Sequence, residues 1–171
     1  MMTAAWGCRH NSLKENNNAQ PWIELLRSGN QGLATSKNIS ITWIASTERL
    51  QAVQAELNKL QFTENPVSPP EIDFETHCAL QLEMGRQPTA GYSLTFNESA
   101  SVVFNSAAVI AVNWQVPSEG TVSAQVITSP YLLLQLKKGE FQSLAVVDQQ
   151  NHTLFESAIP QECRLRYIKR K

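Results

Sequence analysis

The chain has 171 residues, a formal net charge of −1 and only 17% charged residues. Proteins that bind nucleic acids need a clear excess of basic side chains on one face, so this balance argues against that class. It also gives no general attraction to an anionic membrane. The sequence contains no apolar run of about 18 residues, the length that spans a bilayer as a helix.

Residues 1–20 are expected to form a disordered tail, because the Asn-rich stretch after Cys8 shows no periodicity. The letters AAWGC resemble the end of a bacterial lipoprotein signal, in which small residues precede the lipidated cysteine. The basic start and the apolar stretch of about 7 to 15 residues that a secretory signal needs are incomplete here. Cys8 is therefore a candidate lipidation site if translation starts upstream. The alternative is a ragged terminus with a stray cysteine.

Residues 21–171 are expected to form a single β-rich domain that begins with strands over 22–29 and 38–45. The period then changes at residues 46–61, where apolar side chains recur at helical spacing. Ser46 or Thr47 can cap the first turn of this helix. It is the only segment of the sequence with a clear helical pattern.

After a proline-containing linker over 63–71, apolar and polar side chains alternate as in strands. The segments with this pattern are 73–84, 92–97, 108–116, 121–128, 131–138, 143–148 and 152–155. Residues 164–171 form either a last strand or a frayed end. Short, closely spaced strands predict a mainly β fold, either an antiparallel β-sandwich or a partly open barrel, with the helix over 46–61 covering it.

No group of residues in the sequence has the pattern of a catalytic or metal site. His10, His77 and His152 do not share the spacing of metal ligands, and no C-x-x-C pair is present. Nucleophile elbows and phosphate-binding or dinucleotide-binding glycine motifs are also missing from the sequence. We therefore predict no catalytic residues, no metal and no cofactor, and an enzyme is the least favoured class.

Cys78 and Cys163 are in phase with apolar neighbours, so both are expected to face the core. If their strands are adjacent and the compartment is oxidising, they can form a disulfide. Closing so long a loop stabilises a fold by roughly 4 kcal/mol in the chain-entropy model. The alternative is two buried thiols that act as small apolar groups.

The stretch GRQPTAGYS, residues 85–93, separates two strand patterns by more residues than a tight hairpin turn needs. Pro88 stiffens this loop, and Gly85 and Gly91 are expected to take positive φ angles at its two ends. Tyr92 is expected to pack beneath it. A stiff hairpin connection would explain all of these residues.

A functional interpretation adds that a rigid loop loses little entropy on binding and so makes a good contact surface. Thr89 and Ala90 are small and would let the backbone of a partner approach. Pro130 and Tyr131 are expected to lie beside them if their strands end at the same edge. The predicted contact surface is therefore Pro88, Thr89, Ala90, Gly91, Tyr92, Pro130 and Tyr131.

Residues 71–138 resemble the C-terminal domain family of the protease complex subunit PrcB. That family has an acidic-Phe entry, matched by IDFE at 72–75, and then a G-x-x-P-T-G-G-Y signature. The signature is matched by Gly85, Pro88, Thr89, Gly91 and Tyr92, with Ala90 where the family usually has glycine. A later T-x-P-Y segment is matched by Thr128, Pro130 and Tyr131.

The resemblance implies a noncatalytic domain that binds or stabilises another protein. The namesake of the family looks like a bacterial surface lipoprotein that stabilises a partner protease. This implies a protein partner such as a protease, a place in the cell envelope or periplasm, and membrane attachment only through a lipid at Cys8. The family brings no catalytic residues that could be carried over to this sequence.

Two other functions remain open. QPTAGY is similar to the N-P-T-T-G-Y loop of chagasin-type cysteine-peptidase inhibitors, which would make the loop over 86–92 an inhibitory one. Their G-x-G-G loop is missing, and Pro130–Tyr131 is only a partial counterpart of their R-P-W loop. A periplasmic domain for a small ligand is the other alternative, and a pocket lined by Trp43 or Trp114 would favour it.

Overall fold

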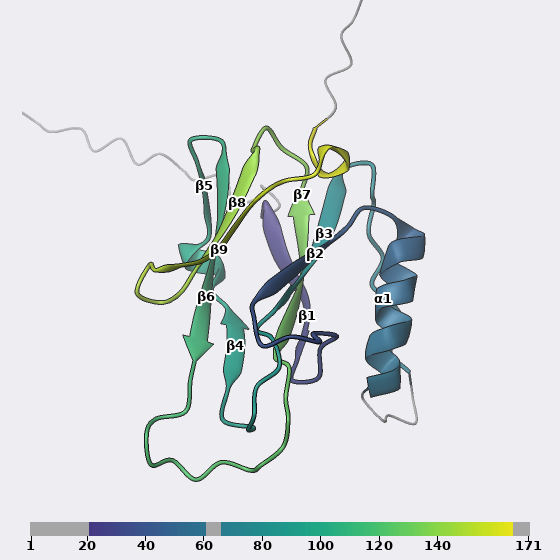
Figure 1. Ribbon diagram of the computed structural model, residues 1–171. Helices are drawn as coiled ribbons and strands as arrows, with labels where there is room; N and C mark the ends of the chain where they lie inside the picture. The colour runs from purple at the N-terminus through teal and green to yellow at the C-terminus, as the bar shows by residue number, and fades with distance from the viewer. Residues whose placement is uncertain (1–20, 61–65, 166–171) are drawn as a thin grey trace, which may run out of the picture.

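The computed structural model describes residues 21–60 and 66–165, and these form two β-sheets and one α-helix (Figure 1). The first sheet is antiparallel and has the strand order β1-β7-β3-β2. Its strands are β1 (Ile23–Gly29), β7 (Tyr131–Lys137), β3 (His77–Glu83) and β2 (Ser40–Ile44).

The second sheet has the strand order β4-β6-β8-β9, with the short β5 also pairing with β6. Its strands are β4 (Ser93–Phe96), β5 (Val102–Phe104), β6 (Ala107–Gln115), β8 (Ser143–Val147) and β9 (Thr153–Ala158). β6 and β8 are parallel, unlike the other pairs. The reason is topological, because the chain leaves β6, crosses to the first sheet as β7 and only then returns as β8.

The main core lies between the two sheets. Alternate residues of β7 point into it, and so do residues of β3, β6 and β8. The buried side chains include Leu132, Leu134, Leu136, Leu80, Leu82, Ile110, Val112, Leu144 and Val146. The predicted sandwich is therefore confirmed.

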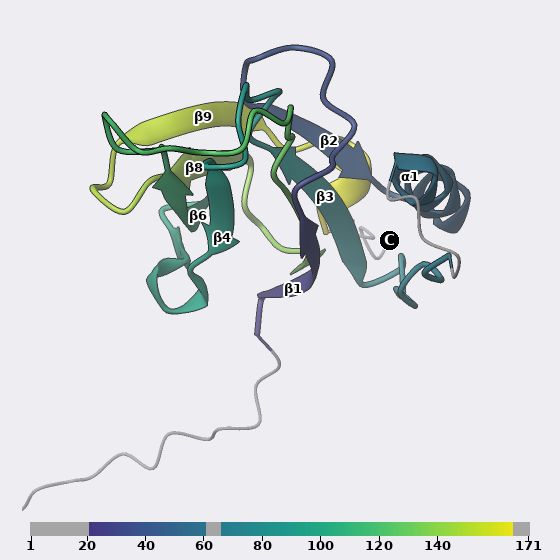
Figure 2. The same ribbon diagram turned by 90° about the horizontal axis from the view of Figure 1, so that it is seen from below.

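Helix α1 (Thr47–Leu60) covers the outer face of the first sheet (Figure 2). Its buried stripe of Leu50, Val53 and Leu57 packs against Tyr131 and other residues that β3 and β7 turn away from the main core. Strand β7 is therefore buried on both faces, which explains its run of leucines. The predicted helix over 46–61 is confirmed, and the Ser46 hydroxyl accepts a hydrogen bond from the Arg49 N–H at 3.3 Å.

None of the helices in the described ranges has the length and apolar character that crossing a membrane requires.

Turn chemistry overrides the alternating pattern at one predicted strand. The segment 73–84 becomes a strand only from His77 onward. The side chain of Asp73 accepts a hydrogen bond from the Thr76 hydroxyl at 2.6 Å, and its backbone carbonyl accepts one from the His77 N–H at 2.8 Å. These bonds close a turn before β3 begins.

The other differences lie in the second half of the chain. Residues 121–128 run without strand pairing except for a bridge between Gln87 and Thr128, so that strand prediction is wrong. Strand β5 was not predicted. Cys163 ends a short 3-10 helix, η2 (Gln161–Cys163), instead of preceding a strand, and residues 166–171 lie outside the described ranges.

Candidate functional site

The loop over residues 85–92 connects the two sheets of the sandwich. β3 lies in the first sheet and β4 in the second, so the expectation of a hairpin connection is wrong. Stacked sheets lie about 10 Å apart, a gap that a two-residue turn does not span. This distance explains why the sequence has a long loop here.

Backbone hydrogen bonds fix the first half of this loop. The Met84 N–H donates to the Pro130 carbonyl and the Arg86 N–H donates to the Ser36 carbonyl, each at 2.8 Å. Gln87 and Thr128 exchange two backbone bonds, at 2.8 and 3.0 Å. The loop therefore leaves β3 in one defined direction.

The second half of the loop packs against residues 116–128, which connect β6 to β7. The Ala90 N–H donates to the Ala124 carbonyl at 3.1 Å, and the Thr128 hydroxyl donates to the Thr89 carbonyl at 3.0 Å. We call residues 85–92 and 116–128 together the loop pair. Both loops lie at the lower end of the molecule in Figure 1.

Glycine is needed at position 91 because of the close approach between these two loops. A Cβ atom there would lie 2.6 Å from the Ser123 Oγ and 2.7 Å from the Pro117 Cγ. The backbone of Gly91 does not have a positive φ, whereas that of Gly85 has φ +86°. The sequence expectation for the two glycines is therefore correct for Gly85 and wrong for Gly91.

The surface of the loop pair is apolar and nearly uncharged. Its exposed aliphatic side chains, with their exposed fractions, are Val116 (54%), Val122 (98%), Val126 (53%) and Ile127 (57%). Glu119 is the sole charged residue in the segment 116–128. Pro88 and Ala90 are also exposed, and Tyr92 packs partly buried against the main core.

Three residues of the predicted contact surface have other roles. Tyr131 is completely buried under α1, and Pro130 is buried at the start of β7. The Thr89 hydroxyl oxygen is also buried, so this side chain does not form an open tip. The structure therefore corrects the expectation that Pro130 and Tyr131 are available to a partner. For the same reason, these two residues cannot act as the counterpart of an inhibitor's R-P-W loop.

Sequence reasoning attached no role to the segment 116–128 and read part of it as an ordinary strand. In the structure its length is notable, because connections beyond about 12 to 15 residues without regular structure are uncommon and usually functional. This length is not visible in the sequence, where residues 121–128 alternate like a strand. Trp43 and Trp114, considered as pocket residues, lie partly buried against the main core. No group of three or more potential metal-ligating side chains occurs in the described ranges.

A buried carboxylate supports the base of the loop pair. Glu83, at the end of β3, accepts hydrogen bonds from the backbone N–H groups of Leu33 and Ala34, the latter at 3.0 Å. It thereby holds the connection between β1 and β2, whose Gly32 N–H donates to the Ser129 carbonyl at 2.7 Å. Burial raises the pKa of Glu83 above its ordinary value, and the two N–H donors oppose this shift only in part.

This raised pKa predicts a pH dependence of stability. Because the folded state binds the proton of Glu83 more tightly than the unfolded state, stability is gained as pH falls through the raised pKa and lost as pH rises through it. The pKa values of Glu48, Asp73 and Asp148 are lowered by hydrogen bonds that outweigh the effect of burial. The stability that these three carboxylates contribute is therefore lost only when the pH falls through their lowered pKa values.

In denaturant titrations between about pH 7.5 and 5, the wild type should therefore gain stability relative to Glu83→Gln as the pH falls. The variant keeps an oxygen acceptor but does not titrate. Glu156→Gln, at an exposed position of β9, is the matched control and should follow the wild type. Parallel pH profiles for the wild type and Glu83→Gln would contradict the assignment.

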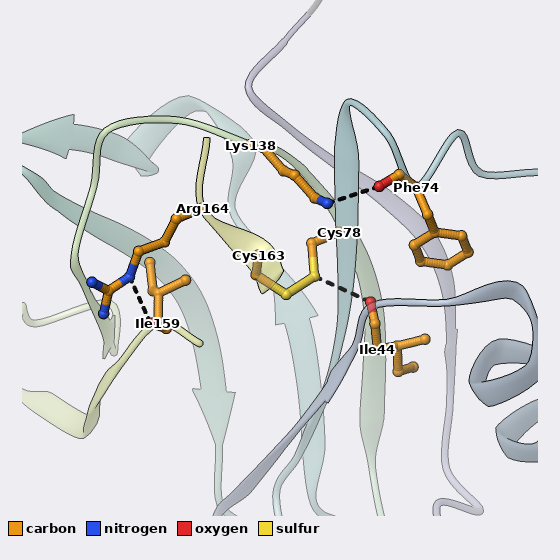
Figure 3. The surroundings of a disulfide bond; sticks show 7 residues. All are labelled: Ile44, Phe74, Cys78, Lys138, Ile159, Cys163 and Arg164. Atoms are coloured by element: carbon orange, nitrogen blue, oxygen red, sulfur yellow. Dashed lines mark hydrogen bonds between the residues drawn. A yellow bond between two sulfur atoms is a disulfide. The ribbon is translucent and has the colours of Figure 1, made fainter. Parts of the chain in front are cut away.

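The structure joins Cys78 of β3 to Cys163 of η2 in a disulfide with a Cα–Cα distance of 5.4 Å (Figure 3). Both side chains are buried. The Cys78 Sγ lies 3.2 Å from the Ile44 carbonyl oxygen, a contact and not a hydrogen bond because a disulfide sulfur carries no hydrogen. Nearby, the Arg164 Nε donates to the Ile159 carbonyl at 2.8 Å, so η2 is held to β3 by the disulfide and to the residue after β9 by this bond.

Sequence reasoning also missed an exposed apolar hairpin at the end of the molecule opposite the loop pair (Figure 1). β5 and β6 are joined by Asn105 and Ser106, which both have positive φ angles and form a tight turn. Before this turn, Val102, Val103 and Phe104 are all exposed, and Phe104 has an exposed fraction of 68%. A run of β-branched and aromatic residues before an Asn-containing turn was the available signal.

Cys8, the candidate lipidation site, lies outside the described residues.

Comparison with known proteins identifies one family. Residues 80–137 match the sequence model of the PrcB C-terminal family. This confirms the resemblance over a range that begins within β3, ends with β7 and contains the whole loop pair. No curated protein and no solved structure matches the chain.

Proposed function

We propose that this chain is a noncatalytic protein-binding domain that uses the loop pair to bind or stabilise a partner protein such as a protease. The observation that carries the proposal is the rigid, nearly uncharged loop pair with its exposed valines and isoleucine. Exposed apolar surface of this kind marks protein interfaces, and depletion of charge is typical of their centres. The match to the PrcB C-terminal family supports association with a protease complex.

The proposed location is the cell envelope, with a lipid at Cys8 as the only membrane attachment. The Cys78–Cys163 disulfide supports an oxidising compartment. When the natural gene is expressed in its own cells, a fatty-acid analogue should label the product, and Cys8→Ser should remove the label. An unlabelled cytosolic product from the wild-type gene would show that the chain is not lipid-anchored.

Ala90→Arg tests the contact surface. The side chain of Ala90 is exposed and only its backbone N–H is used by the fold, so an arginine should change the thermal midpoint by no more than about 2 °C. It should lower retention of the partner in a pull-down from envelope extracts at least about tenfold, because it introduces a charge into an apolar interface.

The matched control is Ala100→Arg, an exposed alanine in the 3-10 helix η1 (Glu98–Ala100) outside the loop pair. It should retain the partner. The captured protein is identified by mass spectrometry, and its lifetime is measured in cells with wild-type or Ala90→Arg protein. If Ala90→Arg changes neither retention nor lifetime of any captured protein, the loop pair is not the contact surface.

A further inference from the structure

Residues 121–127 have the sequence of a strand but use few of their backbone groups. The Val126 N–H donates to the Ala124 carbonyl at 2.8 Å, and the Gln31 Nε2 donates to the Ile127 carbonyl at 3.5 Å. On the edge that faces residues 85–92, the Ala124 carbonyl also accepts a hydrogen bond from the Ala90 N–H, and Thr128 pairs with Gln87. Within the described part of the chain, the backbone N–H groups of Ser123, Gln125 and Ile127 have no hydrogen-bond partner, and their odd spacing from Ala124 and Thr128 puts them on the opposite edge of an extended segment. We call the side of residues 121–127 with these three free donors the open edge.

The open edge lacks the features with which proteins protect an unpaired strand. Exposed edges usually contain lysine, proline or a charged residue that points inward. No charged residue and no proline occurs between Gly120 and Ser129, and the side chains of Val122, Val126 and Ile127 are exposed. Unprotected backbone donors beside β-branched side chains are what an added strand requires.

A cleft lies at the C-terminal end of the open edge. It has a volume of about 590 Å³, and its walls include Leu33, Leu60, Ile127 and Arg86. The nearby Lys59 is paired with Glu56 at 2.6 Å, so Arg86 leaves an excess positive charge in this cleft. An apolar side chain with an acidic group beside it would complement these walls.

We propose that the partner presents an extended segment that adds as a β-strand to the open edge, with an apolar side chain in the cleft and an acidic group facing Arg86. This proposal rests on the proposed function and narrows it, because it specifies an extended segment instead of a folded surface. In strand addition, main-chain hydrogen bonds supply affinity and pockets for alternate side chains supply specificity. The hydrogen bonds between the two loops hold the edge in place before binding, which lowers the entropic cost.

The test uses a displayed random library of peptides of about ten residues, the upper length of an ordinary strand, selected against the full chain. The enriched peptide is synthesised in two forms, one unmodified and one N-methylated at alternate residues. N-methylation removes backbone donors from one edge and keeps the side chains. The unmodified form should bind at least about tenfold more tightly and should shift the amide signals of residues 121–127.

On the protein side, Gln125→Pro removes a backbone N–H that the fold does not use, and Gln125→Ala keeps it. Gln125→Pro should weaken peptide binding at least about tenfold relative to Gln125→Ala, and the two variants should have the same thermal midpoint. Arg86→Glu should reverse a preference for acidic peptides. If Gln125→Pro unfolds the chain, the comparison between the unmodified and the N-methylated peptide is the test of strand addition.

Three results would overturn strand addition. These are the absence of any enriched peptide, equal binding of the N-methylated form, and amide shifts at residues 102–104 instead of the open edge. A different comparison, between the Ala90→Arg and Gln125→Pro variants, tests the proposed function separately from strand addition. Partner retention that is lost in Ala90→Arg but kept in Gln125→Pro leaves a protein contact without strand addition, whereas retention kept in both contradicts both proposals.

Discussion

Replacing Cys78 and Cys163 together by alanine should lower the free energy of unfolding by about 4 kcal/mol. The disulfide joins residues 85 positions apart, so its loss returns the entropy of a long closed loop to the unfolded chain. Both cysteines are buried, one in β3 and one in η2, so the change also removes contacts between the first sheet and the C-terminal segment.

Denaturant unfolding with and without reductant measures this effect. The wild type should lose the same stability when it is unfolded in reductant, whereas the double variant should be insensitive to it. Cys8→Ala is the control, because that residue is not part of the disulfide, and it should unfold like the wild type under both conditions. Wild-type curves that coincide with and without reductant would show that the bond contributes nothing.

The spacing of apolar side chains was sufficient to predict an element where a single period runs through the whole segment. The helical spacing of Leu50, Val53 and Leu57 identified α1. Alternating apolar side chains identified β3 and β6, because alternate residues of each strand pack into the main core. The two-sheet arrangement also followed from the number of short strands. These predictions depend on contacts between near neighbours in the sequence, which a period can encode.

Long-range partners were not predictable in this way. Residues 121–128 alternate like a strand, but whether another strand lies beside them depends on the path of the chain between the sheets. Tyr131 was placed on the surface because it follows a loop motif, although β7 is buried on both faces and α1 covers this residue. Gly91 is required by the approach of Pro117 and Ser123, residues distant in the sequence.

The same limit applies to the candidate site. The sequence identified one of its two loops through Pro88 and the flanking glycines, because turn chemistry is local. The second loop has its turn residues Pro117, Ser118 and Gly120 before residues 121–128, which alternate like a strand, and it supplies most of the exposed apolar surface. The failed strand prediction and the proposed binding edge are therefore the same segment, which fits the expectation that local rules fail at functional sites.

Gly85 and Gly120 provide a matched pair for the second large effect. Both have positive φ, +86° and +81°, so alanine at either position incurs backbone strain of about 1 kcal/mol. A Cβ at Gly120 would meet no atom within 4 Å. A Cβ at Gly85 would lie 2.5 Å from the Lys37 carbonyl oxygen and 2.7 Å from that of Asn38, and these backbone atoms cannot rotate away as a side chain can.

We therefore expect Gly85→Ala to lower the free energy of unfolding by about 2 to 4 kcal/mol, the sum of strain and overpacking, and Gly120→Ala by only about 1 kcal/mol. Denaturant unfolding of both variants gives the difference, which isolates the collision because the strain is common to both. Gly85→Ala should also weaken partner binding, since the adjacent Arg86 N–H anchors the loop to the Ser36 carbonyl. Equal losses at the two positions would mean that the segment 36–38 moves aside freely, and the loop pair would then lack the rigid base on which its proposed role in binding depends.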